Sequence, residues 1–239
     1  MPNEIEKTIK KKQHRIIHSD AIYADFRDKL MKGMVSPLER ITENALAEHY
    51  QVSRTPIREV LTQLLADGLL MKRNSGIYPY VPSYDDLKDL YELRILLETQ
   101  GIRRIQQGQG RLDITLLTQI HEHWDAYQQA RPQPSASFVS EDESFHVSTL
   151  RAAGNKALVD VLENVNTKIR PVRMFDYLSE DRMLATVDEH LGILELIANE
   201  QYEDAVEALQ RHIHTSEQVV LERSSHALSL PRLFGEELL

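Results

Sequence analysis

The sequence contains no cysteine, which excludes disulfide bonds and thiolate metal ligands. Any metal site must therefore use histidine, aspartate or glutamate, a donor set that suits Zn, Ni, Mn or Fe. The sequence also lacks a hydrophobic run near the roughly 20 residues that span a bilayer. Its first residues, MPNEIEKTIKKKQHR, contain no apolar signal core. By elimination, we expect a cytoplasmic protein without a membrane partner.

Charge is unevenly distributed along the 239 residues. Residues 1–80 contain 13 Lys and Arg against 10 Asp and Glu, whereas residues 81–239 contain 15 against 27. A basic first third on an acidic remainder suggests that only the first third contacts nucleic acid. The positive excess is small, however, and the lysine run at 10–12 is equally consistent with a solvated tail.

Hydrophobic residues recur at helical spacing in three segments of the first third. The first segment runs from Asp20 to about Lys32. A short second helix is capped by Thr42, and a third helix is capped by Ser53 and ends at Asp67-Gly68, because glycine accepts the left-handed conformation at a helix C-terminus.

Two short β-like runs follow, at 69–72 and 77–81. They flank Asn74-Ser75-Gly76, whose turn chemistry predicts a hairpin. Helix, turn, helix and hairpin together predict a winged helix-turn-helix.

The second helix of such a motif enters the major groove of DNA, and residues near its N-terminus reach the bases. Arg54 and Arg58 are four residues apart on one face, and each can offer two donors to guanine. Ser53 and Thr55 have hydroxyls suited to phosphates, and the wing, Lys72 to Gly76, can reach the adjacent DNA backbone. The spacing alone leaves open a plain helical hairpin with a solvated arginine pair.

After an expected linker at Pro82-Ser83, the sequence predicts only helices, in an antiparallel bundle of six, or seven if one is broken. Their expected ranges are 84–107, 113–130, 138–152, 156–177, 182–199 and 201–223. The fold class is therefore mainly α. The expected domains are a flexible basic arm (1–17), the winged helix-turn-helix (18–82), a helical metal- and effector-binding domain (83–225) and a C-terminal tail (226–239).

Four residues of the expected bundle form a candidate metal site. Asp142 and His146 are four residues apart and share a helix face. His190 and His212 each lie on the apolar face of a later helix, whereas His214 points away. A buried carboxylate and three imidazoles are costly unless something pairs them, and a cation is the simplest partner. For any one histidine alone, the alternative is an ordinary buried histidine hydrogen-bonded to a neighbour.

The stretch ITENALAEHYQVSRTPIREVLTQLLADGLLMKRNSGIYPYVPS resembles the winged helix of the GntR family of bacterial transcription regulators. The resemblance covers about residues 20–83, and VSRTPIREVL followed by DGLL is its most specific part. It implies that Arg54 and Arg58 read bases while Ser53 and Thr55 contact phosphates. A basic residue often found early in the family's first motif helix is replaced here by Asn44, which puts that contact and the operator preference in question.

The segments LYELRILLE, EDESFHVSTLRAAGN, DEHLGILELIANEQYEDA and LQRHIHTSE resemble the FCD domain, the helical effector module of the FadR subfamily. The resemblance implies that Asp142, His146, His190 and His212 bind a divalent metal at the bundle centre. A small carboxylate or sugar-acid effector is expected to bind at that metal. The whole chain is then expected to be a homodimeric repressor on a pseudo-palindromic operator in double-stranded DNA.

Arg94 lies on the inward face of the first bundle helix and needs a carboxylate there, because a buried guanidinium is costly when unpaired. Glu98, one turn later, offers a purely structural pair. The functional alternative is the carboxylate of the effector, which suits bidentate geometry. Tyr91 either lines the same cavity or packs in the core. Arg170 and Arg173 are weaker candidates, expected more often at the surface.

Two other functions remain open beside the effector-responsive regulator. One is a regulator that senses the metal itself, without an organic effector. The other is a metalloenzyme in which the bound cation activates water. Four protein ligands leave fewer open positions than the usual three of catalytic zinc, and no general base stands out. We therefore expect that the protein is not an enzyme.

Overall fold

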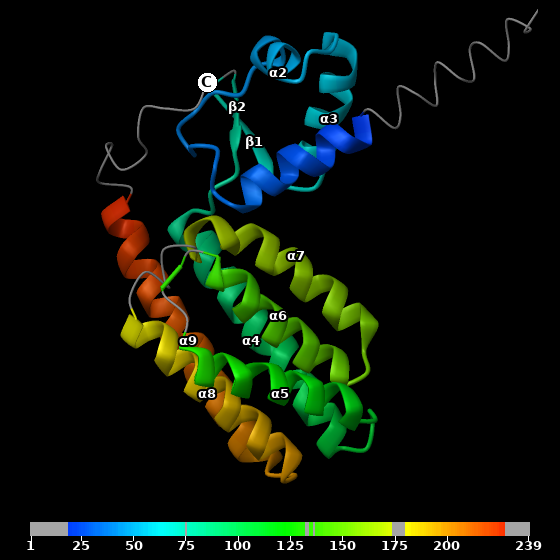
Figure 1. The fold of residues 1–239 in the computed structure, drawn as a ribbon, viewed down its shortest axis with the longest axis vertical. Coiled ribbons are helices and arrows are strands. Elements are labelled where there is room, and N and C mark those ends of the chain that lie inside the picture. The colour runs from blue at the N-terminus through cyan, green and yellow to red at the C-terminus, as the bar shows by residue number, and fades with distance from the viewer. Residues whose placement is uncertain (1–18, 75, 132–133, 136, 174–179, 228–239) are drawn as a thin grey trace, which may run out of the picture. The chain divides into compact units, whose positions relative to one another are not determined.

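The computed structural model describes residues 19–74, 76–131, 134–135, 137–173 and 180–227 (Figure 1). The chain divides into two compact units, Met1–Val81 and Pro82–Leu239. The expected arm at 1–17 lies outside the described residues, and so does the expected tail apart from residues 226–227, which continue the last helix.

The first unit contains the predicted helix-turn-helix. Thr42 begins the first motif helix by accepting a hydrogen bond from the backbone N–H of Ala45 (3.2 Å). Ser53 occupies the N-cap of the next helix as expected, but its side chain makes no capping hydrogen bond. The helices of this unit are 19–31, α2 (Glu43–His49) and α3 (Arg54–Ala66).

The wing consists of two antiparallel strands, β1 (Leu70–Arg73) and β2 (Gly76–Pro79). Their turn includes Asn74 at φ 47°, a left-handed conformation that asparagine adopts more readily than most residues. Ile41 forms an additional bridge with Ile77, which ties the segment before α2 to the wing. The strand β1 begins and ends one residue later than predicted, and β2 begins one residue and ends two residues earlier than predicted; the predicted hairpin is confirmed.

The described part of the second unit contains six helices, which run side by side as a bundle (Figure 1). Ser83, in the expected linker, caps the first of them through a capping box with Asp86. The predicted all-helical bundle is confirmed, although the last helix continues to Ala227. The helices are α4 (Tyr84–Gln106), α5 (Ile114–Ala130), α6 (Phe138–Ala152), α7 (Lys156–Arg173), α8 (Glu180–Ala198) and α9 (Tyr202–Ala227).

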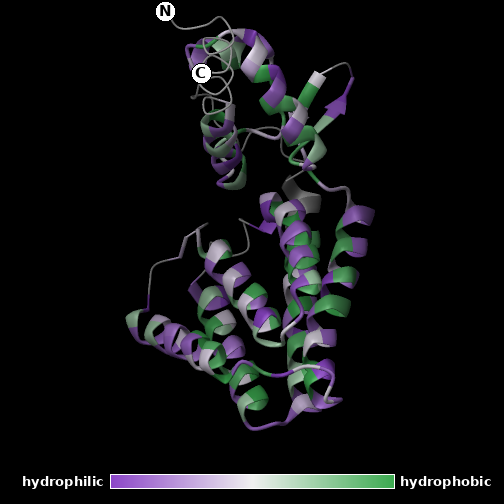
Figure 2. Ribbon diagram, turned by 90° about the vertical axis from the view of Figure 1, so that its right-hand side faces the viewer, coloured by the Kyte–Doolittle hydropathy of each residue, from purple (hydrophilic) through white to green (hydrophobic). Residues whose placement is uncertain are grey.

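Each bundle helix carries both hydrophobic and hydrophilic residues (Figure 2), and the hydrophobic ones form a single buried core. Gly101 brings α4 close to α6, because a Cβ at this position would lie only 2.5 Å from Leu150 Cδ1. This close approach places the polar residues of α4 beside those of α6. No helix among the described residues is long and apolar enough to cross a membrane.

Candidate metal centre and DNA-reading helix

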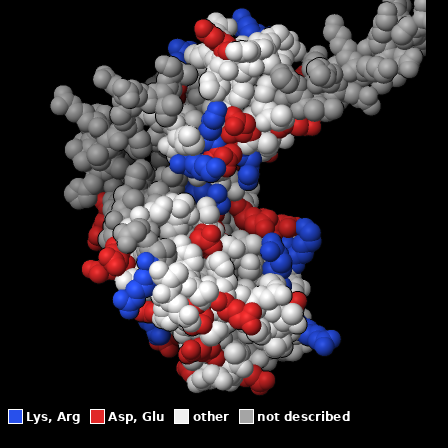
Figure 3. All heavy atoms as spheres, in the orientation of Figure 1, with Lys and Arg blue, Asp and Glu red and all other residues white. Residues whose placement is uncertain are grey.

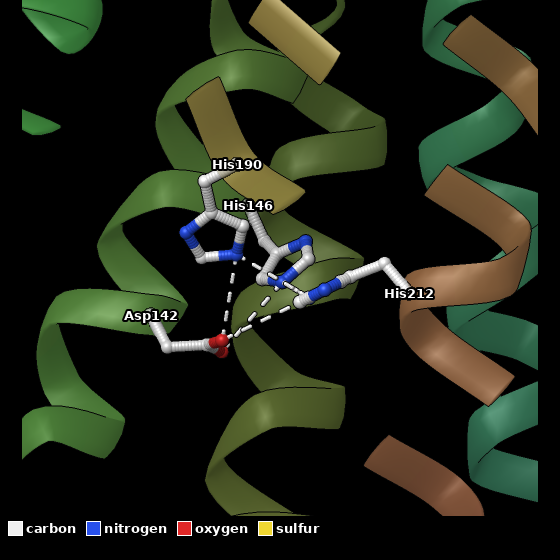
Figure 4. Close-up of side chains that lie close together, drawn as sticks. All are labelled: Asp142, His146, His190 and His212. Carbon is white, nitrogen blue, oxygen red and sulfur yellow. Dashed lines mark hydrogen bonds and ion pairs between the residues drawn. The ribbon is translucent and has the colours of Figure 1, made fainter. Parts of the chain in front are cut away.

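The four predicted ligands come from three helices and meet inside the bundle (Figure 4). Asp142 and His146 project from successive turns of α6, His190 from α8 and His212 from α9. None of the four is more than 2% exposed. The helical phase that selected His212 over His214 agrees with the structure, because the side chain of His214 is 59% exposed and contacts Glu217.

The three imidazoles present the same atom, Nε2, to the centre of the group. His212 Nε2 lies 3.1 Å from His146 Nε2 and 3.3 Å from His190 Nε2. The Asp142 carboxylate oxygens lie 3.6 Å from Nε2 of His146 and of His190, and 3.9 Å from that of His212. One ligand atom from each residue lies within 4.8 Å of all the others.

This arrangement fits a divalent cation better than it fits hydrogen bonding within the group. A neutral imidazole has one N–H, so three Nε2 atoms and a carboxylate cannot all be satisfied by one another. A cation between them accepts a lone pair from each, at about 2.0–2.1 Å for zinc and imidazole nitrogen. Three nitrogens and one oxygen also suit Ni, Mn or Fe.

Burial and neighbouring charges shift the pKa values of His190, His212 and Asp142 in the direction that favours cation binding at neutral pH. Burial lowers the pKa of His190 well below its usual range, and the neighbouring His212 lowers it further. Burial likewise lowers the pKa of His212 to about 4, although its hydrogen bond to Glu189 opposes this. Burial alone would raise the pKa of Asp142, but Arg173 and His146 hold it well below the usual value. Neutral imidazoles and an ionised carboxylate are the forms that bind metal.

Two arginines lie buried beside the carboxylate. Arg173 has no exposed surface and donates from Nη2 to Asp142 Oδ2 at 2.5 Å. The expectation that Arg173 is a surface residue is therefore wrong. The helical phase of α7 could have predicted it, because Arg173 continues the buried stripe of Val165 and Ile169. Arg170 is half-buried and pairs with the buried Glu143.

Arg94 is also completely buried and makes the structural pair that the sequence offered. Its Nε donates to Glu98 Oε1 at 2.7 Å. Its Nη1 and Nη2 make no hydrogen bond with any described residue, and Nη2 lies 4.0 Å from Asp142 Oδ2. Tyr91 is buried in the same helix, with its hydroxyl 3.1 Å from Ser216 Oγ.

The predicted DNA-reading arginines lie on the exposed face of α3. The side chains of Arg54 and Arg58 are 55% and 60% exposed, and both donate to the carboxylate of Glu43 on α2. Ser53 and Thr55 are also exposed, whereas Gly76 is buried at the start of β2. Basic and acidic side chains are interspersed on the visible face of the described residues (Figure 3).

Comparison with known protein families assigns both halves of the chain. Residues 18–78 match the family described as "Bacterial regulatory proteins, gntR family". Residues 89–215 match the FCD domain.

Individual relatives agree with this assignment, and a solved structure shares the fold. The chain is 30% identical, over 78% of its length and 86% of the relative's, to the Nta operon transcriptional regulator of Aminobacter aminovorans. It is 22% identical to the gluconate operon transcriptional repressor of Bacillus subtilis, over 84% of this chain and 78% of that one. The solved structure of Escherichia coli McbR/YncC has the same fold, with a TM-score of 0.67, 15% identity, and coverage of 87% and 98%.

The depressed histidine pKa values predict that acid destabilises the metal-free protein. Between pH 6.5 and about 4 the unfolded chain takes up protons on His190 and His212 that the folded chain does not. The stabilisation is therefore complete above pH 6.5 and is lost as the pH falls toward 4. Melting temperatures of chelator-treated protein should decrease steadily from pH 7 to pH 4.5, equally in wild type and in the exposed-site control His214→Ala. A melting temperature that stays constant from pH 7 to pH 5 would refute this assignment.

Among the histidines compared, metal retention should depend on the buried ones and not on the exposed His214. His190→Ala or His212→Ala removes one converging nitrogen, so we expect elemental analysis of the purified variant to find little bound metal. His214→Ala should retain as much metal as wild type. The single tryptophan, Trp124, has its ring 4.3 Å from that of His190, so its fluorescence should change when metal is added back. Equal metal content in all three variants would contradict the site.

Proposed function

Because the chain belongs to the GntR family of bacterial transcription regulators and carries an FCD domain, we propose that a small carboxylate bound at a divalent metal controls its binding to operator DNA. The family and the relatives are transcription regulators and not enzymes. The metal, the effector and their link to DNA binding are the proposed parts. The observation that carries them is the buried convergence of three imidazole nitrogens and one carboxylate.

Asp142, His146, His190 and His212 are the proposed ligands of the metal. Zn, Ni, Mn and Fe all suit this donor set. When bound, the cation supplies a positive, Lewis-acidic attachment point for an anionic oxygen. The protein supplies enclosure, because every one of these side chains is buried among helices α4 to α9.

Arg94 is the proposed contact for the effector's carboxylate. Its two terminal nitrogens are buried without hydrogen bonds among the described residues, and buried donors of this kind are costly. A carboxylate can accept two parallel hydrogen bonds from one guanidinium. Tyr91, one turn earlier on α4, is a proposed second contact at the same site. Asn166 on α7 is 2% exposed, and neither of its amide atoms makes a hydrogen bond with a described residue, so we propose it as a contact for a further polar group, as in a hydroxy acid or sugar acid.

A metal sensor without an organic effector is the second candidate. The observation in its favour is the short ion pair between Arg94 and Glu98, which gives the buried guanidinium a partner within the chain. The two proposals differ in what controls operator binding. In a sensor of metal alone, a chelator changes operator binding and organic acids do not. In an effector-responsive regulator, the acid changes operator binding while the metal stays bound.

DNA binding is proposed to use Arg54 and Arg58 on guanines, with Ser53, Thr55 and the backbone at Gly76 near phosphates. The arginines already share one face and are held side by side by Glu43. Guanine O6 and N7 would replace the carboxylate as acceptors when the helix enters the major groove.

A homodimer is proposed because a pseudo-palindromic operator needs two reading helices. Leu93 and Leu96 on α4 are large hydrophobic residues with 37% and 56% exposure, and a second copy is proposed to cover them. Repression is proposed because several relatives are repressors by name. A cytoplasmic location is proposed with it.

Arg54→Ala should weaken binding to the preferred operator without unfolding the protein, because the side chain is exposed. Loss of one bidentate guanine contact corresponds to about 1–3 kcal/mol, or roughly 5- to 150-fold in affinity. The operator is obtained by selection from a random-sequence duplex library with wild type, and affinities follow from fluorescence anisotropy. Arg151→Ala, an exposed arginine of the other unit, is the matched control. Unchanged affinity of Arg54→Ala for the selected duplex would reject the major-groove assignment.

Arg94→Lys should lose the effector response while keeping the metal. Lysine retains the positive charge beside Glu98 but not the two parallel donors of guanidinium. Operator affinity is measured with and without sugar acids such as gluconate and with smaller carboxylates, and metal content is measured on the same samples. Arg151→Lys is the control. If the variant responds to the acid as wild type does, Arg94 does not bind the effector and its role is limited to the ion pair with Glu98.

A further inference from the structure

In two of the three converging histidines, a glutamate contacts Nδ1, the ring nitrogen that faces away from the centre of the group. His146 Nδ1 lies 2.5 Å from Glu98 Oε2, and His212 Nδ1 lies 2.6 Å from Glu189 Oε2. A carboxylate at Nδ1 holds the ring hydrogen there, which leaves the lone pair of Nε2 directed toward the centre of the group.

Each of these glutamates is in turn held by an arginine of its own helix. Arg94 Nε lies 2.7 Å from Glu98 Oε1 on α4, and Arg182 Nη1 lies 3.3 Å from Glu189 Oε2 on α8. The structure therefore contains two separate chains of contacts, each running from an arginine through a glutamate to a histidine. The two chains meet where Nε2 of His146 lies 3.1 Å from Nε2 of His212.

The third histidine is held differently. His190 Nδ1 makes no hydrogen bond with any described residue. Its ring stacks on Phe145 with centroids 3.6 Å apart and planes within 9°, and it packs nearly perpendicular to the ring of Trp124, with centroids 4.3 Å apart. Packing between two aromatic rings fixes the direction of His190 without determining which nitrogen carries the hydrogen.

We infer that Glu98 and Glu189 are positioning residues for the metal ligands, each acting through the Nδ1 of one histidine. The inference rests on the proposed metal site and adds residues that do not themselves reach the cation. A carboxylate behind an imidazole fixes the ring's tautomer and orientation and raises its basicity toward metal. His146 and His212 receive this support, whereas His190 depends on the shape of the core.

Neighbouring groups lower the pKa of both glutamates. Burial raises the pKa of Glu98, but His146 and Arg94 outweigh it and bring the pKa to about 2. Burial also raises the pKa of Glu189, and its contacts with His212 and Arg182 lower it below the usual value.

Glu189 is the better position for a test, because its side chain is 35% exposed while that of Glu98 is 3% exposed. Replacement of Glu98 leaves Arg94 buried without its partner and can unfold the bundle. The variants are Glu189→Ala, which removes the acceptor, and Glu189→Gln, which keeps an oxygen that accepts from Nδ1–H. Glu195→Ala is the matched control, because Glu195 is an exposed glutamate of the same helix.

Zinc affinity is measured by competition with a chromophoric chelator, and cobalt(II) is used to record the visible absorption spectrum of the site. We expect Glu189→Ala to bind zinc about 10- to 100-fold more weakly than wild type. Its cobalt spectrum should change, since the spectrum reports ligand arrangement, while the melting temperature of the metal-free protein stays close to that of wild type. Glu189→Gln should recover part of the affinity, and Glu195→Ala should match wild type in every measurement.

The outcomes separate this inference from the metal site itself. Wild-type affinity and an unchanged cobalt spectrum in Glu189→Ala would overturn the positioning role while leaving the site intact. A wild-type protein that binds neither zinc nor cobalt would overturn both.

Discussion

Asp142 carries a negative charge at a position without solvent exposure, so the bundle depends on positive groups to keep that charge inside. Arg173 contacts the carboxylate directly, Arg94 lies at the edge of ion-pair distance, and His146 and His190 face its two oxygens. The divalent cation proposed at the meeting point of the imidazoles would add further positive charge beside this carboxylate. It would also give the Nε2 lone pairs a common acceptor.

A further set of buried and half-buried polar residues surrounds the three histidines. Arginines at 94 and 182 hold the carboxylates of Glu98 and Glu189, and these carboxylates contact His146 and His212. The proposed effector carboxylate at Nη1 and Nη2 of Arg94 would therefore act on a side chain that is linked, through Glu98, to the proposed metal ligand His146. Coupling between effector and metal of about 1–3 kcal/mol is typical of such linked sites, and it is reciprocal by thermodynamic necessity.

Helical periodicity, the turn chemistry at 74–76 and the family resemblance together predicted the fold, and helical phase placed the four converging residues on inward faces. His212 and His214 differ by two positions, about 200° around a helix, which is why the phase separated the buried residue from the exposed one. The glutamates behind the histidines were not predicted as such, because the pairing of Glu189 with His212 depends on how α8 packs against α9 and not on local spacing. Arg173 was misplaced because arginine is usually exposed; only the phase of α7 relative to its apolar stripe indicates its burial. The contact of Glu43 with Arg54 and Arg58 likewise depends on how α2 packs against α3.

The coordination of a bound metal by the buried histidines can be measured by X-ray absorption spectroscopy of the zinc-loaded protein, which reports the kind and number of atoms around the metal. We expect three imidazole rings with nitrogen at about 2.0–2.1 Å, together with at least one carboxylate oxygen. His212→Ala should reduce the number of imidazoles by one in any metal that remains bound. A zinc ion surrounded only by oxygens, or by a single imidazole, would show that the metal binds elsewhere on the protein and would refute the proposed site.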